Sequence, residues 1–196
     1  MPKIGMEPIR RKALIDAAIA AIGDRGALDV TVSDIAGRAG VSSALAHHYF
    51  GNKERLLEAT MRALLTELGQ DVRAGLNAAR TPHGRLAAVI DANFSEKQFA
   101  PATVAAWLAF YVEAERAPVI RHLLMIYRRR LNSNLMHSLR QVTGRDRAER
   151  IAEGIGALID GLYLRRASAP SEGGRTSASA LIHDYLDTQL AQGNAQ

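Results

Sequence analysis

The sequence predicts an all-α protein. Apolar residues recur at helical spacing along most of its 196 residues, and no alternating apolar–polar stretch of useful length favours a strand. Proline and glycine interrupt this pattern at intervals typical of connections between helices. The hydrophobic content of 47% is that of a globular chain. The absence of cysteine excludes disulfides and thiol chemistry and is typical of a reducing cytoplasm.

The first expected helix covers about residues 8–25. Pro8 suits the first turn of a helix, and Gly26 suits the residue just after its end. Apolar residues between them recur at helical spacing, which predicts one buried stripe. The stripe consists of Leu14, Ala17, Ala18, Ala21 and Ile22.

Two short helices joined by a glycine turn are expected between residues 31 and 50. Thr31 can cap the first of them, and Asp34 follows at the spacing of a capping box. Gly40 stands where a left-handed residue ends a helix, and Ser42 is a natural cap for a second helix over about residues 43–49. A short helix pair with such a turn is the helix-turn-helix motif that reads duplex DNA, although similar pairs also occur as purely structural elements.

The second helix of this pair has the composition of a recognition helix. Its N-terminal residues are small, so the backbone can approach base edges in the major groove, and Ala44 and Leu45 can contact a thymine methyl. Lys53 begins the next helix and can pair with a phosphate. His47 and His48 are adjacent, so they point in different directions and form no metal site. The predicted DNA-facing set is Thr31, Ser42, Ser43, Ala44, Leu45, His47, His48, Tyr49 and Lys53.

The rest of the chain is expected to be helical as well. A helix over about residues 52–79 would be roughly 40 Å long and could connect a DNA-binding domain at residues 1–53 with a larger domain at residues 54–196. Thr81-Pro82, Pro101, Pro118, Gly144 and the loop at 170–174 mark the boundaries of further helices. Those helices are expected at about residues 82–95, 101–116, 118–143, 145–168 and 177–192.

The last two helices carry apolar stripes and small residues that favour a dimer interface. Two helices from each of two subunits would form a four-helix bundle, and a two-fold dimer would present two recognition helices to a palindrome. Packing inside one chain is the alternative for the same residues. The stripes are Ile151, Ile155, Leu158, Ile159, Leu162, Leu181, Tyr185, Leu186 and Leu190, and the small residues are Gly154, Gly156, Ala157 and Gly161.

Aromatic and acidic residues of the second domain suggest a cation-binding pocket. Trp107, Phe110 and Tyr111 share one helix face, a stripe that most often packs in a core. Carboxylates in apolar surroundings need a partner, which is either an arginine of residues 128–130, Arg165 or a cationic ligand. Aromatic faces with a carboxylate suit a quaternary ammonium. The predicted ligand-binding set is Asp91, Phe94, Trp107, Phe110, Tyr111, Asp160 and Tyr163.

Residues 31–57 resemble the TetR family of bacterial repressors. Within that family, the chain is similar over nearly its whole length to choline-responsive repressors of glycine betaine synthesis, in the segments MPKIGMEPIRRKALI, AGVSSALAHHYFGNKERLLEATMR, NFSEKQ, AWLAFY, RRRLNSNL and ALIDGLYLR. The resemblance implies an all-helical homodimer with an N-terminal helix-turn-helix domain and a C-terminal domain for effector binding and dimerisation. It also implies binding to double-stranded operator DNA and relief of repression by choline, with Ser43, Ala44, Leu45, His47, Tyr49 and Lys53 facing the DNA.

Other functions are disfavoured. The sequence contains no Ser-His-Asp spacing, phosphate-binding loop or metal motif, so neither an enzyme nor a cofactor is expected. It has no signal peptide or membrane-spanning apolar run, which predicts a cytoplasmic protein. Nine arginines against two acidic residues at 116–150 are interpreted as a solvated helix face. A non-specific DNA binder, and a repressor that responds to another cationic or apolar compound such as an efflux substrate, remain the alternatives.

Overall fold

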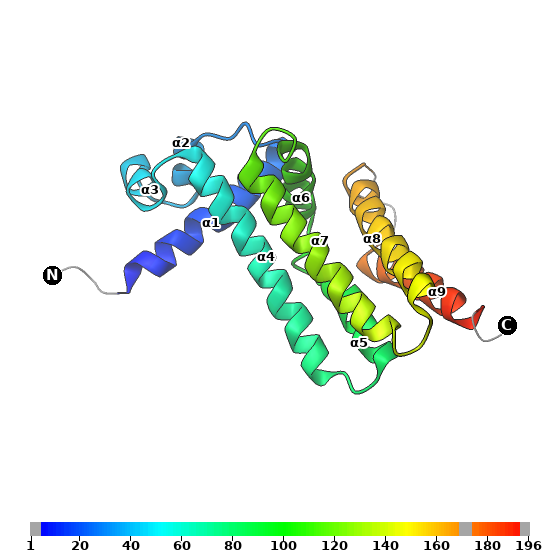
Figure 1. Cartoon of the computed structure of the whole chain (residues 1–196). Coiled ribbons are helices and arrows are strands. Elements are labelled where there is room, and N and C mark those ends of the chain that lie inside the picture. Colours follow the sequence, from blue (N-terminus) through cyan, green and yellow to red (C-terminus); the bar gives the residue numbers. More distant parts are fainter. Residues whose placement is uncertain (1–4, 169–173, 193–196) are drawn as a thin grey trace. The chain divides into compact units, whose positions relative to one another are not determined.

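The computed structural model describes residues 5–168 and 174–192, and these residues form nine helices and no strand (Figure 1). The all-α expectation is therefore confirmed. The contacts divide the chain into two compact units. The first comprises Met1–Leu65 and Ala102–Leu123, and the second comprises Thr66–Pro101 and Leu124–Gln196. The sequence-based division between residues 53 and 54 stays a prediction.

The first unit contains the helix-turn-helix pair. Helix α1 (Met6–Arg25) ends at Gly26, which has a φ of 65° and donates its N–H to the carbonyl of Ile22. The short helices α2 (Val32–Arg38) and α3 (Ser43–Phe50) follow, and the first half of α4 (Lys53–Ala78) completes the segment. The predicted stripe of α1 is buried, together with Val30, Ile35, Ala36, Ala46, Leu56 and Met61.

Helix α6 (Pro101–Glu113) and the start of α7 (Pro118–Leu139) also belong to the first unit. The contact of α6 with α1 requires a glycine. A Cβ added to Gly23 would lie 2.6 Å from the Cα of Ala102. The two helices therefore approach closely at this point.

The second unit is built on the rest of α4 and on α5 (Pro82–Asn93), α8 (Arg145–Ser168), α9 (Arg175–Ala191) and most of α7. Thr81 caps α5 by accepting the Gly84 N–H at 3.0 Å. A Cβ on Gly154 would collide with the Tyr185 phenol, so α8 and α9 also pack closely. The largest core residues of this unit include Leu86, Ile90, Phe94, Leu135, Leu139, Ile155 and Ile182.

Helix α4 is continuous and contributes to both units, and its predicted bounds are correct to within one residue at each end. Helix α7 ends at Leu139 rather than near residue 143, because the chain tightens there and the Gln141 N–H bonds to the Ser138 carbonyl. Most of the predicted loop at 170–174 lies outside the described residues. No helix within residues 5–168 and 174–192 is long and apolar enough to cross a membrane.

Candidate nucleic-acid interface and ligand-binding residues

Both caps predicted for the helix-turn-helix pair are present. The Thr31 hydroxyl accepts the Asp34 N–H at 3.1 Å, and the Asp34 carboxylate accepts the Thr31 N–H at 3.4 Å, which is a capping box. Ser42 caps α3 by accepting the Leu45 N–H at 3.2 Å. Gly40 lies between the helices with a φ of 66°. The local sequence therefore sets both helix starts and the turn.

The carboxylate of Asp34 also ties α2 to α1. The Arg25 guanidinium donates to it at 2.8 Å. Hydrogen bonding with the Thr31 side chain is the main cause that lowers the pKa of Asp34, and the Thr31 backbone and the Arg25 charge lower it further. A second cross-link joins Arg38 of α2 to Asp24 at 2.6 Å. The two ion pairs join α2 to the C-terminal end of α1, and α2 precedes α3 in the motif.

Helix α3 exposes the side that the sequence assigned to DNA. Ala44, His47 and His48 are exposed, while Ala46 and Phe50 are buried. The Ser43 hydroxyl donates to that of Ser33 at 3.1 Å, so two polar side chains meet where α2 and α3 begin. Hydroxyl groups at this place can bond base edges or phosphates. The assignment of the α3 residues to DNA contacts stays a prediction.

His47 has a defined hydrogen-bond role. Its Nδ1 lies 2.8 Å from the carbonyl of Gly51, and a carbonyl can only accept. Nδ1 therefore carries a proton, and the neutral imidazole presents Nε2 as an acceptor. Donation from Nε2 to a phosphate requires the doubly protonated ring. In the described part of the chain, no group of three or more potential metal ligands is gathered.

Arg11 supports the aromatic end of α3, a role that the sequence analysis missed. Its guanidinium lies 5.2 Å from the ring centres of both Tyr49 and Phe50, and Glu7 holds it through a 2.7 Å ion pair. This arrangement is a cation–π contact that orients Tyr49. The signal in the sequence was the pairing of Glu7 and Arg11 one helical turn apart.

A groove of about 450 Å³ lies beside the α3–α4 junction. Arg55 and Arg62 line it from α4, and Arg62 pairs with Glu58 at 2.7 Å. Asn52 caps α4 by accepting the Arg55 N–H at 2.9 Å, which leaves the first N–H groups of the helix directed outward next to Lys53. Basic side chains beside such N–H groups can bind a phosphate, and the assignment of Lys53 to DNA contacts stays a prediction.

The predicted ligand-binding residues belong to both units. Trp107, Phe110 and Tyr111 lie on α6 in the first unit. Trp107 and Phe110 are buried, and the ring centres of Trp107 and Tyr111 are 6.3 Å apart. Phe94 and Tyr163 belong to the second unit. The role of these residues in ligand binding stays a prediction.

Phe94 and Tyr163 form a buried cluster with Phe99, which the sequence analysis did not select. The ring centre of Phe99 lies 5.2 Å from that of Phe94 and 5.7 Å from that of Tyr163, in both cases edge to face. Tyr163 donates to the Asn93 carbonyl at 2.6 Å, and Tyr127 donates to the Asn93 side-chain oxygen at 3.2 Å. Burial raises the pKa of both phenols well above the usual value, so both remain hydrogen-bond donors.

The two carboxylates of the predicted site, those of Asp160 and Asp91, are more exposed than the sequence predicts from the apolar residues around them. The side chain of Asp160 is 40% exposed and pairs with Arg128 at 3.7 Å. That of Asp91 is 58% exposed and pairs with His183 at 2.8 Å. The expectation of carboxylates in apolar surroundings is therefore wrong, because each lies on the outer side of its helix. The expectation of an arginine partner from residues 128–130 is confirmed for Asp160.

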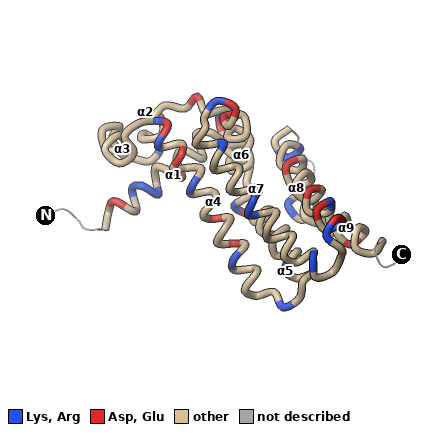
Figure 2. Tube along the Cα trace, in the orientation of Figure 1, with Lys and Arg blue, Asp and Glu red and all other residues tan. Residues whose placement is uncertain are grey.

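The apolar stripes of α8 and α9 are mostly core within the chain. Leu158 and Leu190 are half-buried, whereas Leu164 and Leu181 are exposed, and Ala157 and Gly161 lie on the exposed side of α8. Arginine and acidic residues are interspersed along α8, whereas α9 carries one arginine near its start and two aspartates near its end (Figure 2). The core members of the stripes are Ile151, Ile155, Ile159, Leu162 and Leu186.

Comparison with known families gives two matches. Residues 82–191 match the family described as BetI-type transcriptional repressor, C-terminal, and residues 14–60 match bacterial regulatory proteins, tetR family. An HTH-type transcriptional regulator BetI of Brucella melitensis biotype 2 is 60% identical over 191 residues, which cover 97% of this chain and 96% of the relative.

Solved structures share the fold. A putative transcriptional regulator from Pseudomonas aeruginosa PAO1 is 25% identical, with a TM-score of 0.79 over 94% of this chain and 91% of that chain. A putative transcriptional regulator from Saccharomonospora viridis, solved in complex with choline, is 22% identical, with a TM-score of 0.76 over 90% of this chain and 95% of that chain.

Proposed function

Because the chain belongs to the TetR family of bacterial regulators and carries a BetI-type C-terminal domain, we propose that it represses genes of glycine betaine synthesis and that choline releases it from its operator. Its relatives are DNA-binding transcriptional regulators, and the chain is one of them rather than an enzyme. The 60% identity to a regulator named BetI, which extends over nearly the full length, carries the proposal. The choline bound by the Saccharomonospora neighbour supports the ligand.

The operator contact is assigned to α3. Its exposed side carries Ala44 and His47, and the Ser43–Ser33 pair stands at its beginning. Small and polar groups there suit base edges, while the first turn of α4 suits a phosphate. A single eight-residue helix offers few base contacts, so high affinity requires two copies spaced one turn of DNA apart.

A homodimer would supply the second copy. The side of α8 with Ala157, Gly161 and Leu164 is exposed among the described residues, and a Cβ on Gly161 would meet nothing within 4 Å there. Leu181 of α9 is 47% exposed. Small residues and exposed leucines on adjacent helices suit a two-fold four-helix bundle. The proposed interface is this side of α8 and α9.

Helix α4 is the proposed lever. It is one helix that contributes to both units, so a ligand-dependent shift of its C-terminal half would be transmitted to the half that follows α3. A swing from 1:99 to 99:1 between the bound and released states requires that choline favour the released state by about 5.5 kcal/mol. Choline itself would be held by aromatic faces and a carboxylate.

The proposal is tested on the purified full-length protein. An operator is first selected from random duplexes, and its affinity is then measured by fluorescence anisotropy at fixed salt, without and with choline. Glycine betaine is the control, and the emission of Trp107, the only tryptophan, reports ligand binding. Choline alone should change the emission and weaken operator binding. Saturating choline with unchanged operator affinity would refute the lever, and no response to choline would favour a regulator of another compound.

A further inference from the structure

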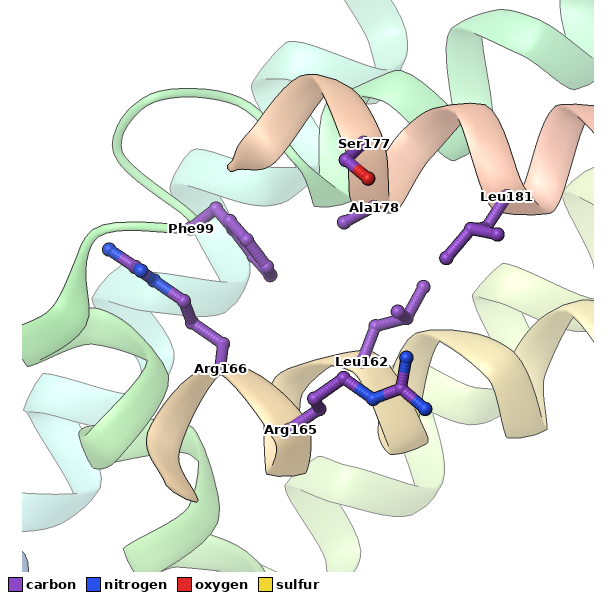
Figure 3. A pocket seen from close by; sticks show the side chains of 7 residues that line it. All are labelled: Phe99, Leu162, Arg165, Arg166, Ser177, Ala178 and Leu181. Carbon is purple, nitrogen blue, oxygen red and sulfur yellow. The ribbon is translucent and has the colours of Figure 1, made fainter. Parts of the chain in front are cut away.

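A cavity lies between α8 and α9, on the side of the segment that precedes α6 (Figure 3). Its volume is about 150 Å³. All residues that line it belong to the second unit, and none was selected from the sequence as a ligand-binding residue. They are Phe99, Leu162, Arg165, Arg166, Ser177, Ala178 and Leu181.

The polar groups of this cavity favour an anion. Arg165 and Arg166 both line it, although the Arg166 guanidinium lies beyond Phe99, and the Ser177 hydroxyl adds a donor from α9 (Figure 3). None of the described residues that line it is acidic. Arg166 lies over the Phe99 ring at 5.8 Å, whereas no carboxylate of the described residues lies within 4.0 Å of the Arg165 guanidinium. A quaternary ammonium would meet the like charge of Arg165 here, and a carboxylate would meet an opposite one.

The other walls of the cavity are apolar. Phe99 and Leu162 are buried, and Leu181 stands opposite Leu162 across the space (Figure 3). An engineered apolar cavity of about 150 Å³ in another protein accommodates benzene. The space therefore suits an apolar group the size of one ring or a short branched chain.

We propose that this cavity binds a small carboxylate with a compact apolar group. The carboxylate would accept from Arg165 of α8 and from Ser177 of α9, and the apolar group would contact Phe99, Leu162 and Leu181. Because its donors come from both helices, such a ligand would join α8 to α9. The site goes beyond the proposed choline response, since its ligand has the opposite charge.

Benzoate is the first probe, since its ring matches the size of the cavity and its carboxylate is complementary to the Arg165 guanidinium. Calorimetry on the full-length protein should show saturable binding of benzoate, and benzyltrimethylammonium should not compete with it. The variant Arg165→Gln should weaken benzoate binding by about tenfold or more, because a charge-assisted hydrogen bond is lost. Arg150→Gln is the matched control, since Arg150 is an exposed arginine of α8 that does not line the cavity.

Thermal unfolding of both variants shows whether each is folded, and Ser177→Ala provides an independent variant on α9. Ser177→Ala should weaken benzoate several-fold, and the response to choline should be unchanged in all three variants. Absence of saturable benzoate binding to the unmodified protein would overturn the proposal. Equal weakening by Arg150→Gln, or displacement of benzoate by benzyltrimethylammonium, would also overturn it. Loss of the choline response alone would instead bear on the proposed function.

Discussion

The hydroxyl of Tyr163 provides a test of whether the aromatic cluster of the second unit is core or pocket. It donates to the Asn93 carbonyl at 2.6 Å, and the phenol is buried. The variant Tyr163→Phe keeps the ring and removes only this hydrogen bond. A buried hydrogen bond of this kind contributes about 1–2 kcal/mol, including the cost of a carbonyl left unpaired. We therefore expect the free energy of unfolding to fall by about 1–2 kcal/mol.

Thermal and urea unfolding measure this loss. For a protein of this length each kcal/mol corresponds to roughly 2–4 °C, so the melting temperature should fall by about 2–8 °C. Tyr185→Phe is the matched control, because no hydrogen-bond partner of its hydroxyl lies among the described residues, and it should change the melting temperature little. Choline affinity, read from Trp107 emission, should stay within about twofold, since a cation contacts the ring face and not the hydroxyl.

Two results would refute this reasoning. If Tyr163→Phe unfolds at the same temperature as the unmodified protein, the hydrogen bond to Asn93 contributes nothing to stability. If the variant is as stable as expected but has lost its choline response, the hydroxyl itself contacts the ligand. The cluster would then be part of a binding site rather than only its support.

Three further predictions follow from local geometry. Gly23→Ala should destabilise the first unit by about 1–3 kcal/mol in urea unfolding, because the added Cβ meets the backbone of Ala102. Ser42→Ala should weaken operator binding measured by anisotropy, because it removes the N-cap of α3, and such a cap contributes about 1 kcal/mol. Ser42→Thr keeps a capping hydroxyl and should largely retain operator affinity. The free energy of unfolding should fall as the pH rises above about 10, because Tyr127 and Tyr163 ionise there in the unfolded chain, whereas their raised pKa values keep them protonated in the folded protein. A variant with both tyrosines replaced by phenylalanine should show a smaller fall when unfolding is measured as a function of pH.

The local features of the fold could be predicted because short-range chemistry decides them. Thr31, Asp34 and Ser42 cap helices through atoms three residues away, and Gly26 and Gly40 take left-handed conformations that other residues avoid. Such signals are contained in a few consecutive residues. These signals are sufficient to predict the helix-turn-helix motif from the sequence, without knowledge of tertiary contacts.

The surroundings of the candidate ligand-binding residues could not be predicted in the same way, because burial depends on which side of a helix packs against another. Asp160 stands among leucines in the sequence but lies on the outer side of α8, where Arg128 reaches it. Phe99 was overlooked since it follows the charged segment SEKQ, yet its ring joins Phe94 and Tyr163. Tertiary packing, which sequence spacing does not encode, decides these cases.

The two carboxylates differ in how easily a cation could use them. The Arg128–Asp160 pair is long, at 3.7 Å, and its arginine is 66% exposed, so this pair contributes at most about 1 kcal/mol and can be displaced. Asp91 is held by His183 at 2.8 Å. If a carboxylate contacts choline, Asp160 is therefore the better candidate, and Asp160→Asn should weaken choline binding by about tenfold while Asp91→Asn changes it little. Titration of Trp107 emission measures both, and a larger effect of Asp91→Asn would reverse the assignment.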